Sequence, residues 1–312
     1  DFPDGFGAFG ALGPVDQPDT SPAVAIDGSN TVLLGGADLS FATPLRDLAT
    51  GDVDGDGLLD LIVARDGSSD IVVQRGDAEG IFSQTEESYP VGNAGPPAAV
   101  AIADRDGNDV IDLIVSVSPG TDQVSVFTAT SNGNFAAAVN YDLTEGDEPE
   151  SVALGDVNGD GTLDIITANT GSGSVSVLIG NTDGTFQIPI QTSVPVSGST
   201  AFPFFSIVTD DVNGDGNDDI VVAGSSSNQV SVLASDGSGM FVSPVTYDVS
   251  FGPQALTLED VNGDNIRDIV TANGSSNNVS VLTGNVDGTF NAKQDFAAGD
   301  GPFSVVPGDV NG

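Results

Sequence analysis

A nine-residue acidic pattern recurs along the chain and constrains the fold more than any other feature. In one copy, DVNGDGTLD, acidic or amide side chains occupy the first, third, fifth and ninth positions. Complete copies begin at Asp52, Asp104, Asp156, Asp211 and Asp260, and a sixth start, DVNG, lies at Asp309. The steps between these starts are 52, 52, 55, 49 and 49 residues. Such a step is typical of a four-stranded propeller blade and is too long for most helical repeats.

Each repeat has the same internal order. The acidic loop is followed by a β-branched run such as IIT at 165–167, then by a Ser/Asn/Gly turn and a VSVL run such as 175–178. A Gly-x-Phe element closes each unit, at Phe82, Phe135, Phe186, Phe241 and Phe290. Short runs of Val and Ile between Gly, Asn and Asp turns indicate antiparallel strands, and no window has helical apolar spacing. We therefore predict an all-β fold, a β-propeller of four-stranded antiparallel blades.

The stretches DVNGDGTLDIITAN and VSVLIGNTDGTF resemble the FG-GAP/VCBS repeat family, whose members resemble the β-propeller of integrin α subunits. The resemblance covers residues 21–312, including five complete copies of the pattern. It implies a propeller that carries calcium in the loop between the first two strands of each blade. It also implies that a backbone carbonyl at the seventh loop position is a ligand.

The residue types in the loop fit this metal. Calcium takes six to eight oxygen ligands, and side chains at alternate positions of a tight loop can all turn inward. We expect about five calcium ions, one for each complete repeat. The predicted side-chain ligands are Asp52, Asp54, Asp56, Asp60; Asp104, Asp106, Asn108, Asp112; Asp156, Asn158, Asp160, Asp164; Asp211, Asn213, Asp215, Asp219; and Asp260, Asn262, Asp264, Asp268.

The backbone positions between the ligands also fit a loop that curls around an ion. The fourth position is Gly in every copy, and the sixth is Gly, Asp or Asn, the residues that best tolerate a positive φ. An acidic Asx turn without metal is the alternative, because Asp, Asn and Gly all favour turns. We favour the metal, because clustered carboxylates without a cation would repel one another or shift their pKa values upward.

The composition limits the class of partner. The chain has 312 residues, of which 46 are acidic and 6 basic, for a formal charge of −40. With 38% hydrophobic residues it is too apolar for a disordered acidic tail, and its charge opposes nucleic-acid binding. No apolar stretch approaches the roughly 18 residues that cross a bilayer, so we expect no membrane insertion. The acids beyond the loops indicate a surface suited to salty or extracellular water, or a patch for a cationic partner.

The loops also suggest a location. Loops with three carboxylates and no final bidentate Glu should bind calcium weakly, with Kd of about 10⁻⁴–10⁻³ M. Such sites need extracellular calcium, and we therefore expect an extracellular or cell-surface protein. Two glycosylation sequons, Asn273-Gly-Ser275 and Asn278-Val-Ser280, agree with that location.

Two segments near the termini differ from the repeat. Residues 1–20, rich in Gly, Pro and Phe, form an N-terminal arm that is either a flexible leader or a segment that docks on a neighbouring subunit. Residues 21–312 form the propeller. Within it, residues 23–44 resemble part of a blade without a calcium loop, and residues 302–309 resemble a first strand. These two segments could combine into a sixth, composite blade, whereas related propellers more often have seven.

The residue types argue against catalysis. Histidine and cysteine are absent, which removes the usual general base and the thiol nucleophile. Tyr89, Tyr141, Tyr247 and Phe296 share one repeat position, and we expect them to pack between blades. We expect no recognition role for the Arg75-Gly76-Asp77 tripeptide, which lies in an ordinary turn.

Three function classes follow. The first is a non-enzymatic extracellular propeller that acts in adhesion or as a structural subunit of a surface layer or filament. The second is a calcium-dependent glycan- or protein-binding module, although the absence of Trp weakens a lectin. The third is a polysaccharide lyase or hydrolase. The expected partner is a protein or glycan at the cell surface, or a second copy of the chain through the N-terminal arm.

Overall fold

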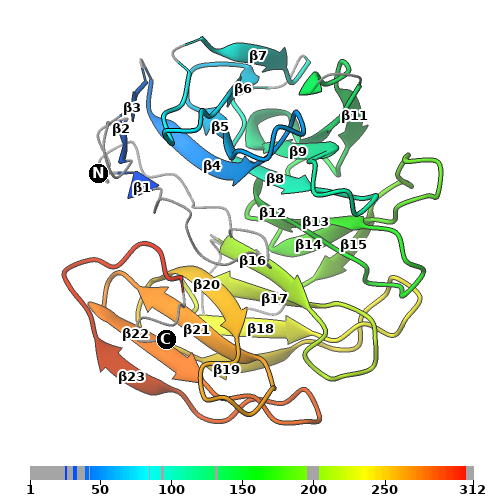
Figure 1. Cartoon of the computed structure of the whole chain (residues 1–312). Coiled ribbons are helices and arrows are strands. Elements are labelled where there is room, and N and C mark those ends of the chain that lie inside the picture. The colour runs from blue at the N-terminus through cyan, green and yellow to red at the C-terminus, as the bar shows by residue number, and fades with distance from the viewer. Residues whose placement is uncertain are drawn as a thin grey trace. The chain divides into compact units, whose positions relative to one another are not determined.

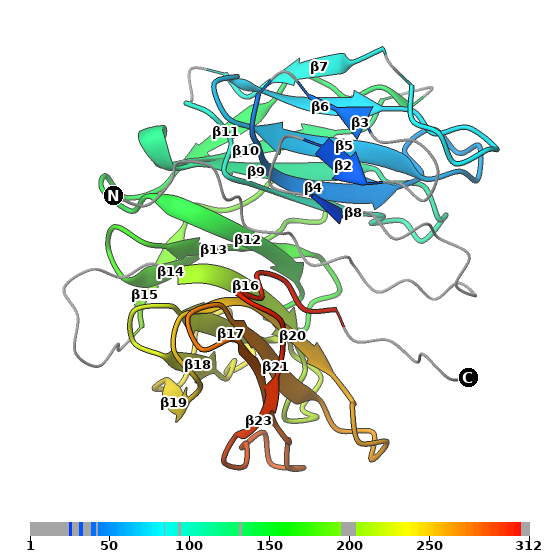
Figure 2. The same cartoon turned by 90° about the vertical axis from the view of Figure 1, so that its left-hand side faces the viewer.

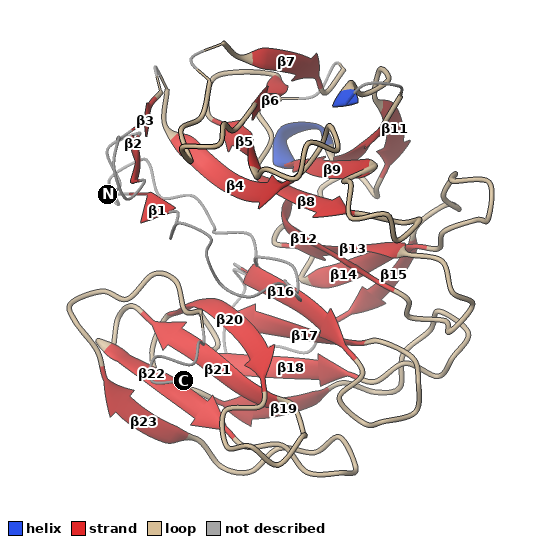
Figure 3. Cartoon of the chain, viewed as in Figure 1, coloured by secondary structure: helices blue, strands red, loops and turns tan. Residues whose placement is uncertain are grey.

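The computed structural model describes residues 25–26, 31–33, 39–41, 43–83, 85–92, 95–130, 133–194 and 204–306. The predicted arm, residues 1–20, lies outside this set. The chain forms two compact units, residues 1–145 and residues 146–312. Strands joined by loops are the main regular secondary structure of both units (Figure 3).

Unit 1 contains one three-stranded and two four-stranded antiparallel sheets (Figure 1). The three-stranded sheet consists of β1 (Ala25–Ile26), β2 (Thr31–Leu33) and β3 (Leu39–Ser40). The next sheet consists of β4 (Leu45–Gly51), β5 (Asp60–Arg65), β6 (Asp70–Gln74) and β7 (Glu87–Pro90). The third consists of β8 (Ala99–Ala103), β9 (Leu113–Ser118), β10 (Gln123–Thr128) and β11 (Val139–Asp142), with the short 3-10 helix η1 (Pro119–Thr121) between β9 and β10.

Unit 2 contains three four-stranded antiparallel sheets (Figure 2). The first consists of β12 (Pro149–Gly155), β13 (Asp164–Asn169), β14 (Ser174–Leu178) and β15 (Ile190–Ser193). The second consists of β16 (Phe204–Asp210), β17 (Asp219–Gly224), β18 (Gln229–Leu233) and β19 (Val245–Asp248). The third consists of β20 (Pro253–Glu259), β21 (Asp268–Asn273), β22 (Asn278–Leu282) and β23 (Gln294–Ala297).

The predicted order of each repeat is confirmed. In all five four-stranded sheets, consecutive strands pair as neighbours, so that the chain runs up and down through each sheet. The acidic loop always joins the first strand to the second, and the ninth loop position begins or directly precedes the second strand. The Gly-x-Phe element forms an isolated bridge back to the end of the third strand, as at Gly180 and Phe186.

The core lies between consecutive sheets of each unit. Residues of the two middle strands, such as Ile62, Ile166 and Ile220, are fully buried. In unit 1, one cluster joins the sheet β4–β7 to the sheet β8–β11 and includes Phe127 and Phe135. In unit 2, two clusters join its three sheets in sequence. Burial on both faces of a strand explains why these runs are continuously apolar rather than alternating.

Polar contacts between first strands support this packing, and the sequence pattern did not reveal them. The Val100 N–H of β8 donates to the buried Asp47 carboxylate of β4 at 2.9 Å. At the same repeat position in unit 2, the Leu256 N–H of β20 donates to the Ser206 hydroxyl of β16 at 3.2 Å. The side chain five residues before the acidic loop therefore holds the first strand of the next sheet.

The recurrent aromatic position packs between sheets at Tyr89 and Tyr247, as predicted, but not at Phe296. Tyr89 of β7 meets Phe135 of the next sheet edge-on, with ring centroids 5.6 Å apart. Tyr247 of β19 meets Phe290 in the same way at 5.5 Å, and its hydroxyl accepts the Phe290 N–H at 3.2 Å. Phe296 holds this position in the last sheet and is 52% exposed.

The two ends of the chain leave part of the prediction open. Residues 302–306 have no assigned strand, and residues 307–312 lie outside the described set. The composite blade therefore stays a prediction. No helix among the described residues has the length and apolarity needed to cross a bilayer.

Truncating Tyr247 tests the contact between sheets in unit 2. We expect Tyr247→Ala to lower the free energy of unfolding by about 2–4 kcal/mol, because it removes an aromatic pair and leaves a gap beside Phe290. Phe296→Ala is the matched control at the exposed position and should cost less than about 1 kcal/mol. Urea unfolding in calcium measures both variants. Equal losses would show that the Tyr247 contact does not hold the sheets together.

Candidate metal centre

The five acidic loops share one backbone conformation. We number them loop 1 (52–60), loop 2 (104–112), loop 3 (156–164), loop 4 (211–219) and loop 5 (260–268). The fourth position of every loop has a positive φ, from 68° at Gly159 to 81° at Gly263. The sixth position does too, even where it is Asp109 (66°) or Asn265 (64°). The predicted left-handed positions are thus confirmed. They turn the backbone amides of each loop toward the centre of that loop.

The first Asp of each loop organises these amides. The N–H of the sixth residue donates to this carboxylate at 2.6–2.8 Å in all five loops. In loop 5, the Asn265 amide is the largest influence that holds the pKa of Asp260 below its usual value. The pKa of Asp104 in loop 2 is also lowered, because four backbone amides outweigh the opposing effect of burial. Asp104 and Asp260 are therefore ionised near neutral pH and are oriented by the loop amides.

The ninth Asp joins the loop to the sheet. In loop 3, Asp164 is fully buried and accepts the N–H of Val157 at 3.0 Å and that of Gly180 at 2.8 Å. Gly180 follows the third strand, so this one carboxylate connects the loop, the start of the second strand and the end of the third. Asp60, Asp219 and Asp268 make the same pair of contacts in loops 1, 4 and 5.

Burial makes the charge of this ninth residue costly. It raises the pKa of Asp164 to about 6, with the nearby Asp156 and Asp160 carboxylates acting in the same direction. Burial likewise raises the pKa of Asp219 to about 6, helped by Asp215 and Asp211. At these two residues burial is thus the largest cause of the raised pKa, and the neighbouring carboxylates add to it in the direction expected for a cluster without a cation.

Loop 1 brings three acidic ligands together most closely. Ligand oxygens of Asp52, Asp54 and Asp60 all lie within 4.8 Å of one another. Two oxygens on opposite sides of one calcium ion are at most about 5 Å apart, so this spacing fits a single ion. In loops 4 and 5 the third residue is Asn, and the Asn213 side chain lies 3.1 Å from Asp219 Oδ2.

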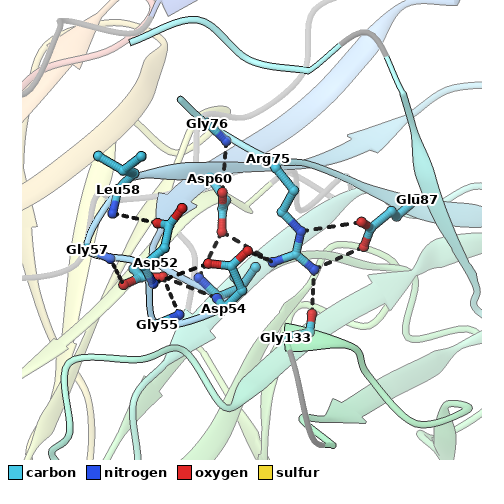
Figure 4. A network of polar contacts seen from close by, with 12 residues as sticks. Asp52, Asp54, Gly55, Gly57, Leu58, Asp60, Arg75, Gly76, Glu87 and Gly133 are labelled. Carbon is cyan, nitrogen blue, oxygen red and sulfur yellow. Dashed lines mark hydrogen bonds and ion pairs between the residues drawn. The ribbon is translucent and has the colours of Figure 1, made fainter. Parts of the chain in front are cut away.

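A guanidinium also contacts loop 1 (Figure 4). Arg75 Nη1 lies 3.3 Å from Asp60 Oδ2 and 3.6 Å from Asp54 Oδ2, while Nη2 lies 3.0 Å from Glu87 Oε2. The Gly76 N–H is bound to Asp60. The Arg75-Gly76-Asp77 tripeptide is thus tied into the loop and its turn, which agrees with a structural rather than a recognition role.

The donor set fits a hard cation. Carboxylate and amide oxygens are the ligands that calcium prefers, whereas zinc sites use His and Cys, which this chain lacks. A carboxylate oxygen has two lone pairs, so accepting one loop amide leaves room for a metal bond. The first, third, fifth and ninth side chains of each loop would hold the ion. Calcium bound there would supply positive charge to the buried ninth carboxylate.

A pH series tests the assignment of the ninth position. A carboxyl whose folded pKa is raised favours folding when protonated, so its contribution is full below pH 4 and is lost as pH rises through 6. We therefore expect the metal-free protein to gain melting temperature between pH 7.5 and pH 5, and Asp164→Asn/Asp219→Asn to gain less. Circular dichroism melts of both proteins measure this. Protonation of the other acids relieves charge repulsion equally in the unsubstituted protein and in the double variant. If the two proteins gained the same melting temperature, the assigned role of Asp164 and Asp219 would therefore be contradicted.

The solved structures that resemble this chain show its fold. A protein from Lactobacillus plantarum has a TM-score of 0.69 at 14% identity, over 87% of this chain and 76% of that one. The periplasmic gluconolactonase of Pseudomonas aeruginosa has a TM-score of 0.60 at 16% identity, over 84% and 72%. An N-acetylglucosamine-recognising lectin of Agrocybe aegerita has a TM-score of 0.56 at 19% identity, over 85% and 73%.

The sequence comparisons identify the repeat. No curated protein sequence matches this chain. The model of the FG-GAP-like repeat matches residues 52–115, 111–167, 211–271 and 260–312, which together span more than half of the chain. The structural neighbours are β-propeller proteins, in agreement with the five four-stranded sheets. The chain therefore belongs to the FG-GAP-like repeat family and has an all-β, β-propeller fold of four-stranded antiparallel blades.

Proposed function

We propose that this chain is a non-enzymatic, calcium-stabilised propeller of the cell surface or extracellular space, acting in adhesion or as a structural subunit of a surface layer or filament. The observation that carries the proposal is the repeated loop itself. Five times, at the same point of the sheet, four oxygen-bearing side chains recur at fixed positions of one loop, and in four of these loops the ninth carboxylate is buried. Repetition at equivalent points of a scaffold is typical of structural metal sites rather than of a single catalytic centre.

The location follows from the proposed affinity. Loops of this type fill at calcium concentrations of about 10⁻⁴–10⁻³ M, well above the resting cytosolic level. At 100 times Kd, one filled site would add roughly 2.7 kcal/mol to the free energy of unfolding. A protein that depends on such sites would be stable outside the cell and weakened inside it.

One glycosylation sequon does not support this location. Asn273 is fully buried in β21, and its amide nitrogen lies 2.8 Å from the Ser280 hydroxyl and 3.0 Å from the Asn278 side chain. A glycan could not be accommodated there in the folded protein. Asn278 is only half-buried, so the second sequon is the one that the fold leaves accessible.

An exposed apolar face supports self-association. In unit 2, the sheet β20–β23 exposes positions that are buried in the sheet before it. Val261 is 46% exposed where Val212 is buried, and Val279 is half-buried where Val230 is buried. Phe296 of β23, the last strand in the order of this sheet, is exposed as well. In the preceding sheet the equivalent face packs on the sheet that follows. The exposed face of β20–β23 could therefore bind a sheet of a second copy of the chain. Repetition of such a head-to-tail contact would build a filament.

The enzyme hypothesis has less support. The likeness to a gluconolactonase is at 16% identity and concerns the fold, which hosts many functions. The chain has no His or Cys to act as base or nucleophile, and its clustered carboxylates lie in the acidic loops as predicted metal ligands. An open recess of about 560 Å³ beside loop 5 is polar and is lined in part by Asn262, Asp264 and Asn285. Its amide and carboxylate groups would suit the binding of sugar hydroxyls better than they would suit a catalytic site.

Light scattering tests the proposed assembly. In millimolar calcium we expect particles much larger than a 31.2 kDa monomer, and we expect them to dissociate on chelation. Phe296→Asp should reduce assembly by placing a charge on the exposed face. Ile188→Asp, at an 86% exposed position in the connection before β15, should leave assembly unchanged. Monomers under both conditions would overturn the structural-subunit proposal and direct attention to glycan binding at the recess beside loop 5.

A further inference from the structure

Loop 2 differs from the other four at its second position. Val occupies this position in loops 1, 3, 4 and 5, as at Val53 and Val157, which are fully buried. Loop 2 has Arg105 instead. The chain has only six basic residues, so a guanidinium inside a predicted calcium loop is a marked departure from the pattern.

The ninth residue of loop 2 is turned toward this arginine. Arg105 Nε lies 2.9 Å from Asp112 Oδ1, and the Arg105 backbone N–H donates to the same oxygen at 3.3 Å. The Asp112 side chain is 23% exposed, whereas Asp60, Asp164, Asp219 and Asp268 are at most 1% exposed. The ion pair therefore draws Asp112 out of the position that its four counterparts occupy.

A second contact is rearranged in loop 2. The amide that follows the third strand donates to the ninth carboxylate in the other loops, but the Ala129 N–H donates to the Asp112 backbone carbonyl, at 2.8 Å. The side chain of Ala129 does not account for this change. Ser235 occupies the same position in unit 2 and still donates to Asp219 at 2.8 Å. Arg105 is the side chain that contacts the Asp112 carboxylate directly.

The acidic ligands of loop 2 do not converge as those of loop 1 do. Both loops have Asp at the first, third and ninth positions. The three ligand oxygens lie within 4.8 Å of one another in loop 1, and this is the one such acidic group in the described part of the chain. Loop 2 therefore has the acidic positions of loop 1 without their convergence, and a fixed positive charge lies beside them.

The arginine beside loop 1 has a different effect. Arg75 contacts Asp54 and Asp60, yet the loop keeps its converging oxygens. Loop 1 also has a fourth carboxylate, Asp56. Four carboxylates and one guanidinium leave a charge of −3, the same as the three carboxylates of loops 3, 4 and 5. Arg75 thus offsets an extra charge and leaves the ninth carboxylate, Asp60, buried, whereas the ninth carboxylate paired with Arg105, Asp112, is partly exposed.

We propose that Arg105 closes loop 2 as an internal counter-ion, so that this loop does not take calcium at concentrations that fill the other four. This inference rests on the proposed calcium role of the remaining loops. It makes the sheet β8–β11 independent of calcium and reduces the expected number of ions from five to four. The guanidinium is part of the chain, so loop 2 keeps its closed form when calcium is removed.

Calorimetric titration of calcium into the metal-free full chain tests this inference. Arg105→Val restores the residue that the other loops have, and we expect it to bind one ion more than the unsubstituted chain. Arg105→Gln, which keeps the side-chain length and removes the charge, should also gain one ion. Arg267→Val is the matched control, because Arg267 lies in loop 5 but its Nε contacts Asp210, which is not a predicted ligand, at 2.6 Å.

The possible outcomes separate the two proposals. A gain of one ion in both Arg105 variants, with none in Arg267→Val, supports the counter-ion role. The same number of ions in the unsubstituted chain and in both folded Arg105 variants overturns it, while leaving the calcium role of the other loops intact. No calcium binding by any of the proteins overturns the proposed function itself. Circular dichroism confirms that each variant is folded, and Arg105→Gln serves if Arg105→Val is not.

Discussion

The buried carboxylate at the ninth loop position is the interaction on which four of the five four-stranded sheets depend, the sheet that contains loop 2 being the exception. It accepts one amide from the acidic loop and another from the turn after the third strand, so it holds three segments of the sheet together. A buried charge with two neutral donors is only partly compensated, and other carboxylates lie nearby. The blade therefore needs either a proton or a cation at this point, and which of the two it has sets its stability.

The six basic residues show how the chain places its positive charge. Each of them lies within 4.0 Å of a carboxylate, and two of them, Arg75 and Arg105, contact predicted metal ligands. Both of these belong to unit 1. In unit 2, the ion pairs among the described residues do not involve the predicted ligands of loops 3, 4 and 5. These ligands are therefore available to bind other cations. Unit 2 should therefore depend on calcium more than unit 1 does.

The sequence was sufficient to predict the repeat, the order of strands and the left-handed loop positions, because these follow from local residue types. It was not sufficient where the outcome depends on neighbours in space. Asp47 looked like an ordinary strand residue, yet it binds the next sheet at Val100. Asp112 matched its counterparts by spacing, but the side chain next to it decides where it points. Asn273 matched a sequon, but its strand is buried. Knowledge of which residues face one another would have been needed in all three cases.

The melting temperature of the full chain in calcium, in magnesium and in chelator tests the central claim most directly. Magnesium prefers a smaller octahedral shell and is the matched divalent control. The account predicts that about 10 mM calcium, roughly 100 times a Kd of 10⁻⁴ M, raises the melting temperature by more than about 5 °C over chelator, which corresponds to roughly 2.7 kcal/mol for a single filled site, and that magnesium does much less. A melting temperature that is the same in calcium and in chelator would contradict the account, and the loops would then be acidic turns held by their own amides.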